Sequence, residues 1–206
     1  MNGHLVLRLG VTAGAYLLGS VSFATLIVKL FHGADVRDLG SGNAGAANVF
    51  RSAGGRLAAA TLLLDVAKGA AAVYAMKLVT PDPSWTGAAG VAAVVGHVFP
   101  VWFAFAGGKG AATALGAFAL LAPWAAISVA VVFGLVVATT RLVSLGSVTA
   151  ASLLPMASGL VFGSPDAVVV AAAATTLLLL VAHRKNIARL FAGTERKLGD
   201  EEDREE

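Results

Sequence analysis

Apolar segments long enough to cross a lipid bilayer follow one another along almost the whole chain and leave no stretch for a separate soluble domain. The 206 residues are 57% hydrophobic and only 13% charged, and their mean hydropathy is +0.80. A water-soluble domain carries about 25% charged residues. We therefore expect an integral membrane protein, because most of its surface must face something other than water.

The spans are expected to be α-helical. About 20 helical residues cross the apolar core of a bilayer, and the runs at 58–60 and 177–180 lack the alternation of barrel strands. Breaks at charged residues, proline and glycine give seven candidate spans, some of them short: 4–29, 57–79, 86–104, 111–122, 124–140, 145–162 and 166–183. We predict an all-α integral membrane protein of about seven transmembrane helices, with a membrane domain over residues 1–198 and a disordered acidic tail over 199–206.

The basic residues predict how these helices are oriented. Pro123 divides segment 111–140, and placing Lys109 and Arg141 on the same side requires a hairpin of two short helices rather than one bent helix. The N-terminus is then outside and the C-terminus cytoplasmic, with the glycine-rich loops at the cytoplasmic face. Cytoplasmic loops are enriched in Lys and Arg, and the residues placed there are Arg37, Arg51, Arg56, Lys109, Arg141, Arg184, Lys185, Arg189, Arg196 and Lys197.

Composition excludes several kinds of chemistry. The chain has no cysteine, so it forms no disulfide, thioester intermediate or cysteine-ligated metal centre. Its net charge is only +3 and its basic residues are dispersed among apolar segments, so nucleic acid is not an expected partner. The sequence contains no set of metal-ligand residues, and we expect no metal and no cofactor.

The first polar cluster, residues 35–51, contains three glycines interleaved with Ser41, Asn43, Asn48 and Arg51. Glycine permits positive φ angles and lets backbone amides approach an anion closely. The cluster is therefore a candidate anion site. The alternative is an ordinary flexible cytoplasmic loop.

The second polar cluster, residues 107–113, reads GGKGAAT and directly precedes a predicted helix. A helix N-terminus beside a Lys is suited to bind phosphate. The nucleotide-binding loop is not matched, because Phe103 stands where its first glycine belongs and Gly110 follows Lys109 in place of Ser or Thr. Lys109 is thus either an anion ligand or a positive topological anchor beside a glycine turn.

Two more polar clusters follow, at 141–147 and 183–195, and the first of them contains Ser144. Helical spacing in the second places His183 and Asn186 on one face, with Arg189 next to Asn186. Taken alone, the second cluster could be only a basic membrane anchor.

Charged residues also occur inside the predicted span 57–79. Asp65 and Lys68 are three residues apart and can pair on one helix face. Charges at this depth are costly and by default mark a functional interior, although a pair that only fixes helix packing is the structural alternative. His97 is interpreted as an interfacial histidine rather than a catalyst. Cations and amide donors gathered at one face suit a phosphorylated substrate that must meet a lipid.

These clusters resemble the motifs of the bacterial membrane acyl-phosphate:glycerol-3-phosphate acyltransferase family. The similarity spans about residues 16–197 and rests on 40–51, on 96–100 with 107–110, and on 183–190 with Gly193 and Glu195, while 19–21 and 64–69 also fit. Three positions depart from the usual pattern. Ala47 replaces Thr, Ser22 replaces Pro, and Ala106 replaces Lys or Arg. Without a hydroxyl, Ala47 cannot be a required ligand here.

The resemblance implies transfer of an acyl chain from acyl phosphate to the 1-hydroxyl of glycerol 3-phosphate, giving lysophosphatidic acid and phosphate in phospholipid synthesis. The donor is already activated, so no covalent nucleophile or metal is required, and proximity with electrostatic stabilisation could supply most of the rate. The expected partners are acyl phosphate, glycerol 3-phosphate and membrane lipid, and the expected site is the cytoplasmic face of the cell membrane.

The clusters and the resemblance together assign candidate roles. The phosphate ligands are expected to be Ser41, Arg51, Lys109 and Ser144. The expected catalytic residues are His183, Asn186, Lys109 and Ser41, with His183 and Asn186 orienting the attacking hydroxyl or polarising the acyl group. The expected substrate-binding residues are Ser41, Asn43, Asn48, Arg51, Lys109, Ser144, His183, Asn186 and Glu195, with Asn43 and Asn48 shaping the first loop. Asp65, Lys68 and His97 are expected to support the site.

A transporter or channel for a small phosphorylated anion is the alternative function, because intramembrane charges and glycine-broken helices are also transporter traits. Transporters usually contain an internal repeat, and none relates the two halves of this sequence. A transport site would also lie near the bilayer midplane, whereas the polar clusters are predicted to lie at one face.

Overall fold

A computed structural model describes residues 3–199, and within this range the secondary structure is entirely helical. The predicted acidic tail, 199–206, lies outside the described residues except for Gly199, and the extent of the membrane domain stays a prediction. The α-helices are α1 Gly3–Gly19, α2 Phe23–His32, α3 Ala46–Ala53, α4 Gly55–Val79, α5 Pro83–Val98, α6 Ala111–Leu121, α7 Pro123–Thr140, α8 Val143–Met156, α9 Asp166–Ala182 and α10 Arg184–Phe191. Short 3₁₀ turns occupy Val36–Asp38 and Val101–Phe103, and a π-helical turn at Ala157–Val161 extends α8.

Five helical segments are long and apolar enough to cross a membrane: Gly3–His32, Gly55–Val79, Pro83–Phe103, Pro123–Thr140 and Val143–Val161. A sixth is reached if α9 and α10, which are bent by 64° relative to each other, count as one span. The remaining apolar helix, α6, has 11 residues and is only about 17 Å long. The all-α membrane fold is confirmed, with five or six spans by length and α6 as a shorter additional helix.

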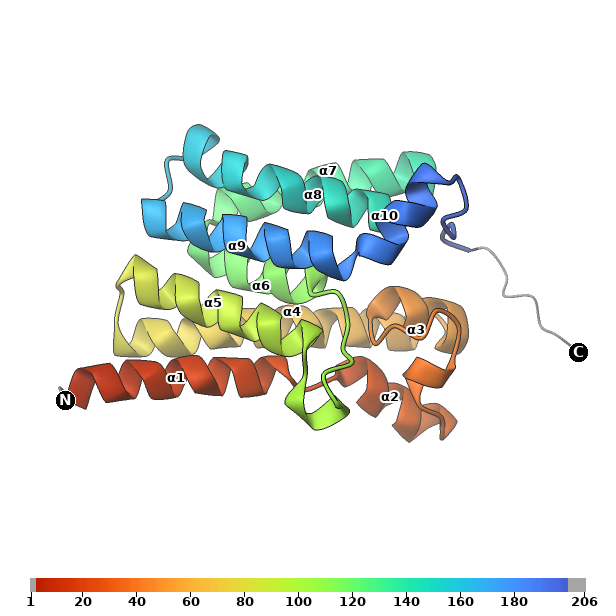
Figure 1. Cartoon of the computed structure of the whole chain (residues 1–206), viewed down its shortest axis with the longest axis horizontal. Coiled ribbons are helices and arrows are strands. Elements are labelled where there is room, and N and C mark those ends of the chain that lie inside the picture. Colours follow the sequence, from red (N-terminus) through yellow and green to blue (C-terminus); the bar gives the residue numbers. More distant parts are fainter. Residues whose placement is uncertain (1–2, 200–206) are drawn as a thin grey trace, which may run out of the picture.

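The chain reverses direction between α6 and α7, as the position of Pro123 predicted. A single residue, Ala122, separates the two helices, and Pro123 occupies the first turn of α7, where its missing N–H leaves no hydrogen bond unmade. Phe118 of α6 and Val129 of α7 belong to one apolar cluster, so α7 runs back along α6 (Figure 1).

Two expected features differ in the structure. The predicted span 4–29 is broken at residues 20–22, between α1 and α2, and the Lys68 ammonium donates a 2.6 Å hydrogen bond to the Val21 carbonyl that this break leaves free. Ser22, which replaces the usual Pro, accepts a hydrogen bond from the Thr25 amide and caps α2. The first polar cluster, expected to be a loop, contains the short helix α3. Local apolar periodicity predicts neither difference. The break in the first span depends on the long-range hydrogen bond from Lys68, which satisfies the freed Val21 carbonyl.

Glycines bring the helices of two pairs into close contact. A Cβ atom placed on Gly19 or Gly96 would overlap the backbone of α5 or α1, and one placed on Gly69 or Gly116 would overlap the backbone of α6 or α4. Small residues allow such backbone approach in membrane helices, where packing rather than the exclusion of water drives association. The α4–α6 contact fixes the short α6, and with it the start of the helix at Ala111.

The bundle has two different ends (Figure 1). The start of α1 lies at one end with the α4–α5 and α8–α9 turns, while α3, α10 and the α7–α8 turn gather at the opposite end. Three of the polar clusters predicted from the sequence, at 35–51, 141–147 and 183–195, therefore lie at the same end of the bundle.

Replacing Gly116 with Val tests the α4–α6 contact. The added side chain meets the carbonyl of Val66, and overpacking of this kind costs about 1–3 kcal/mol or more. We expect Gly116→Val to unfold at a clearly lower temperature in detergent than the unmodified protein. Gly134→Val is the matched control, because no atom lies within 4 Å of the added Cβ. Equal unfolding temperatures for both variants would contradict the close contact.

Candidate active site

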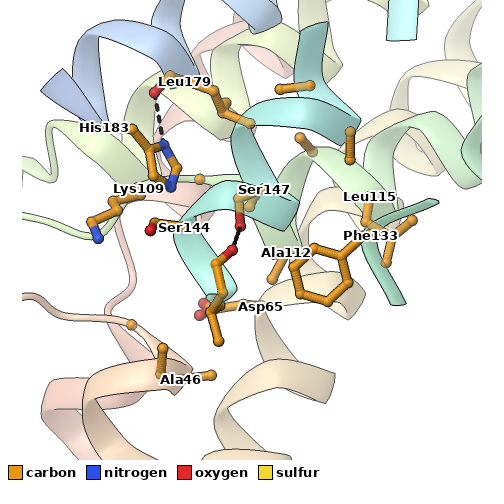
Figure 2. A pocket seen from close by; sticks show the side chains of 18 of the residues that line it. Ala46, Asp65, Lys109, Ala112, Leu115, Phe133, Ser144, Ser147, Leu179 and His183 are labelled. Atoms are coloured by element: carbon orange, nitrogen blue, oxygen red, sulfur yellow. Dashed lines mark hydrogen bonds between the residues drawn. The ribbon is translucent and has the colours of Figure 1, made fainter. Parts of the chain in front are cut away.

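A pocket of about 230 Å³ lies among α3, α4, α6, α7, α8 and α9. Figure 2 shows that Lys109, Ser144 and His183 lie on one side of it, and Leu115 and Phe133 on the other. The polar lining consists of Asn43, Arg51, Asp65, His97, Lys109, Ser144, Ser147, His183, Asn186, Glu195 and Arg196. The apolar lining includes Leu62, Leu115, Phe118, Val129, Phe133, Leu154 and Leu179. The pocket therefore joins a charged end to an apolar arm.

Three helices begin at the charged end without a side-chain cap. The residues before α3, α6 and α8 are Gly45, Gly110 and Leu142, and none of them accepts a capping hydrogen bond. The first four N–H groups of a helix have no partner within the helix, and a helix N-terminus favours negative charge. First-turn residues of all three helices line the pocket: Ala46, Ala47, Ala111, Ala112, Val143 and Ser144. The pocket thus combines several amide donors with cations, as an anion site requires.

Lys109 lies directly before α6, outside the apolar spans. Gly110, which follows it, has a φ of 84°, a left-handed conformation that glycine adopts without strain and that turns the chain into α6. Burial lowers the pKa of Lys109 to about 8; Glu195 partly offsets this effect, while Arg189 and Arg51 add to it. Lys109 is therefore a cation at neutral pH that loses its charge more easily than an ordinary lysine.

His183 directly follows the last residue of α9, and its side chain is buried. Its Nδ1 lies 2.8 Å from the Leu179 carbonyl oxygen, which can only accept, so Nδ1 carries the proton of this hydrogen bond. Burial, together with the positive charge of Lys109, lowers the pKa of His183 to about 4. At neutral pH the ring is neutral and Nε2 is an acceptor, which suits it to orient a hydroxyl group.

Glu195 holds two side chains of α10 at the charged end. It accepts hydrogen bonds from the Asn186 side chain and, at 2.7 Å, from Arg189 Nε. Partial burial tends to raise the pKa of Glu195, but the hydrogen bonds from Asn186 and Arg189, together with the charge of Arg189, outweigh burial and lower it. An ionised Glu195 therefore fixes the Asn186 amide at the pocket wall.

The first polar cluster is organised by Asn48, which is 1% exposed. Its Oδ1 accepts hydrogen bonds from the Ser41 amide at 2.9 Å and the Ser41 hydroxyl at 3.1 Å, and its Nδ2 donates to the carbonyls of Val36 and Leu39. Arg51 donates a 3.4 Å hydrogen bond to Ser41 Oγ and also lines the pocket. Asn48 and Ser41 thus hold the loop that carries Asn43 and Arg51.

Asp65, Lys68 and His97 form a buried group next to the glycine turn, which comprises residues 107–110. Lys68 Nζ lies 2.9 Å from Asp65 Oδ1, and His97 Nδ1 lies 3.5 Å from the same oxygen. The His97 carbonyl accepts a hydrogen bond from the Gly108 amide, and a Cβ atom on Gly108 would overlap the His97 ring. The group therefore supports the turn that carries Lys109.

The structure brings most of the predicted site residues together. Ser41, Asn48 and Lys68 do not line the pocket, whereas Ala47, with its methyl group, does. Ala106 is exposed. Sequence reasoning missed Ser147 and Arg196, which also line the pocket; the three-residue spacing from Ser144 was the available signal for Ser147. The predicted residues that line the pocket are Asn43, Arg51, Asp65, His97, Lys109, Ser144, His183, Asn186 and Glu195.

The fold and the pocket define a multi-pass integral membrane protein whose pocket has a charged end and an apolar arm. Residues 9–193 match the family model described as glycerol-3-phosphate acyltransferase. The chain belongs to this family, and the membership favours the acyltransferase over the transporter.

Individual relatives agree with this assignment. A glycerol-3-phosphate acyltransferase of Anaeromyxobacter dehalogenans is 43% identical over 96% of this chain and 100% of the relative. A glycerol-3-phosphate acyltransferase of Halalkalibacterium halodurans is 44% identical over 90% of this chain and 93% of the relative. The crystal structure of PlsY (YgiH), an integral membrane glycerol 3-phosphate acyltransferase, in its glycerol 3-phosphate form has a TM-score of 0.88 and 38% identity, and 93% of this chain and 96% of that chain are covered. Its lysophosphatidic acid form has a TM-score of 0.85 and 37% identity.

Removing one charge of the buried pair should be more harmful than removing both. Lys68→Met leaves Asp65 without its cation and the Val21 carbonyl without its donor, which costs about 3–5 kcal/mol for a buried pair. We expect a large fall in unfolding temperature, and partial recovery when Asp65→Leu is added. If the single variant is as stable as the unmodified protein, the pair does not hold the fold together.

Proposed function

We propose that the chain transfers an acyl group from acyl phosphate to the 1-hydroxyl of glycerol 3-phosphate, giving lysophosphatidic acid and inorganic phosphate for phospholipid synthesis. The observation that carries this proposal is the continuity of a charged, amide-lined end with an apolar arm in one pocket. One end suits phosphates, and the other suits a hydrocarbon chain. The glycerol hydroxyl oxygen bonds to the acyl carbon, the bond from that carbon to the phosphate oxygen breaks, and phosphate departs with the hydroxyl proton.

Phosphate binding is assigned to the charged end. Arg51 and Lys109 supply the charge, Ser144 supplies a hydroxyl, and the starts of α3, α6 and α8 supply amides. Charge-assisted contacts of this kind are the strongest hydrogen bonds available to a protein. Two phosphates held side by side bring the glycerol hydroxyl to the acyl carbon, so the reaction is accelerated mainly by proximity and by stabilisation of the departing phosphate.

His183 and Asn186 are assigned to the reacting groups. The acceptor nitrogen of His183 orients the glycerol hydroxyl, and the Asn186 amide, held by Glu195, polarises the acyl group. With a pKa of about 4, His183 is a weak base at neutral pH, so the proton passes to a phosphate oxygen of the donor. Asn43, Asn48 and Ser41 shape the first loop, and Asp65, Lys68 and His97 support the glycine turn.

Assay of the purified protein tests the reaction directly. With acyl phosphate as the only donor and glycerol 3-phosphate as the acceptor, we expect lysophosphatidic acid to form. Within residues 3–199 no three His, Cys, Asp or Glu side chains gather as a metal site would need, so we expect full activity with a chelator present. Strict dependence on a divalent metal or on a thioester donor would overturn the proposal. Uptake of glycerol 3-phosphate into liposomes without any acylation would favour the transporter.

Lys109 is the sharpest test of the phosphate site. Lys109→Ala should lower kcat/KM by about one to two orders of magnitude, whereas Lys109→Arg should keep partial activity because it retains the charge. Lys185→Ala, an exposed basic residue outside the pocket, is the matched control and should be fully active.

The pH dependence follows from the lowered pKa of Lys109. Its cation is present below about pH 8 and is lost as the pH rises through that value, so kcat/KM for glycerol 3-phosphate should fall above pH 8. Lys109→Arg should remove this fall, because arginine stays charged. An unchanged alkaline limb in Lys109→Arg would assign the titration to another group.

The orientation in the membrane is also proposed. Arg141, in the α7–α8 turn, and Arg184, at the start of α10, lie at the end opposite the start of α1 (Figure 1), and positive loops face the cytoplasm. The N-terminus is then outside, and the C-terminus and the active site are cytoplasmic. Tags beside Asp82 and Gly163 should be reached by an impermeant reagent added outside the cell, and a tag after Gly199 should not. Reaction of the Asp82 or Gly163 tag only after permeabilisation would reverse the assignment.

A further inference from the structure

The apolar arm of the pocket has a closed floor. Phe118 lines the arm, is 1% exposed and is the bulkiest fully buried side chain among the described residues. Leu154 and Ala126 lie in the same apolar cluster and also line the arm. Behind them the cluster continues through residues that do not line the pocket, Ala122, Ala125 and Val168. The arm therefore ends at Phe118, where the close-packed core begins.

The length of the arm follows from the helices that form its walls. Lining residues on α6 run from Ala111 to Phe118, a rise of about 10 Å, and those on α8 run from Val143 to Leu154, a rise of about 16 Å. Lys109 stands just before the first stretch, and the polar Ser144 lies at the start of the second. A molecule whose phosphate occupies the charged end would therefore place its hydrocarbon tail along these walls, with the tail end toward Phe118.

We propose that Phe118 sets the upper limit on the acyl chain length that this enzyme uses efficiently. This inference rests on the proposed function, because it takes the hydrocarbon in the arm to be the acyl chain of the donor and of the product. Phe118 at the floor is bulky, and five alanines are among the residues that line the pocket: Ala114, Ala126, Ala130, Ala150 and Ala151. A chain that reaches the ring must bend or leave its last methylenes outside the arm, while a shorter chain leaves the floor unfilled.

Two substitutions should move this limit in opposite directions. Phe118→Ala removes the ring and lengthens the arm, because a core position vacated by a large side chain refills only partly. Ala151→Leu adds bulk to the wall, about 10 Å along α8 from Ser144, and shortens the arm. Each methylene that gains or loses burial changes kcat/KM by roughly fourfold, since burial contributes about 0.8 kcal/mol for each methylene.

The experiment measures kcat/KM for a series of saturated acyl phosphates of increasing chain length. Phe118→Ala should shift the optimum to longer chains, and Ala151→Leu should shift it to shorter ones, with changes of several-fold for each added methylene near the limit. Ser152→Leu is the matched control, because Ser152 is the next residue of α8, is exposed and does not line the pocket. Its chain-length profile should equal that of the unmodified protein.

A second measurement keeps the test independent of turnover. Lysophosphatidic acids of the same chain lengths are added to each variant in detergent, and the rise in unfolding temperature reports binding. Phe118→Leu replaces Phe118→Ala if the latter does not fold. A length preference that is the same in all folded variants, by both measurements, overturns the limit set by Phe118. No product from the unmodified protein with any acyl phosphate overturns the proposed function and the length limit with it.

Discussion

The hydrogen bond from the Lys68 ammonium to the Val21 carbonyl joins α4 to the break between α1 and α2, and an ion pair within α4 couples Lys68 to Asp65. The two charged side chains are 1% and 3% exposed, so each needs the other where little water is available. The same ammonium satisfies the backbone where the first span breaks between α1 and α2. Asp65 in turn lies beside His97, whose carbonyl holds the glycine turn. One buried cation therefore links the break in the first span to the turn that presents Lys109.

The short helix α6 connects the buried Asp65–Lys68 pair on α4 to the pocket. Close backbone contact through Gly69 and Gly116 sets α6 against α4, and the turn at Gly110 starts it beside Lys109. The N-terminus of α6, a helix of 11 residues, faces the pocket, and first-turn residues of α3 and α8 line the same pocket. Backbone amides and cations from segments far apart in the sequence thereby line one pocket, and the helix walls beyond them form its apolar arm.

In the polar network at the mouth of the pocket, different residues provide the positive charge and the hydrogen-bond acceptor. Lys109 and Arg51 contribute positive charge, while His183 is kept neutral by burial and by Lys109, and it offers an acceptor nitrogen. Glu195, kept ionised by its hydrogen bonds, holds the Asn186 side chain in place.

The sequence by itself determined the membrane class, the apolar helices, the hairpin at Pro123 and most pocket-lining residues, because hydrophobic length, charge and glycine spacing are local properties. It did not show that the first span is broken or that Ser147 and Arg196 line the pocket. Nor did it show that the Asn48 side-chain amide donates its hydrogen bonds to backbone carbonyls of its own loop. Only the tertiary structure decided these points. Which backbone group Lys68 satisfies, and which side chain closes the apolar arm, depends on contacts between segments dozens of residues apart, and no local pattern encodes those distances.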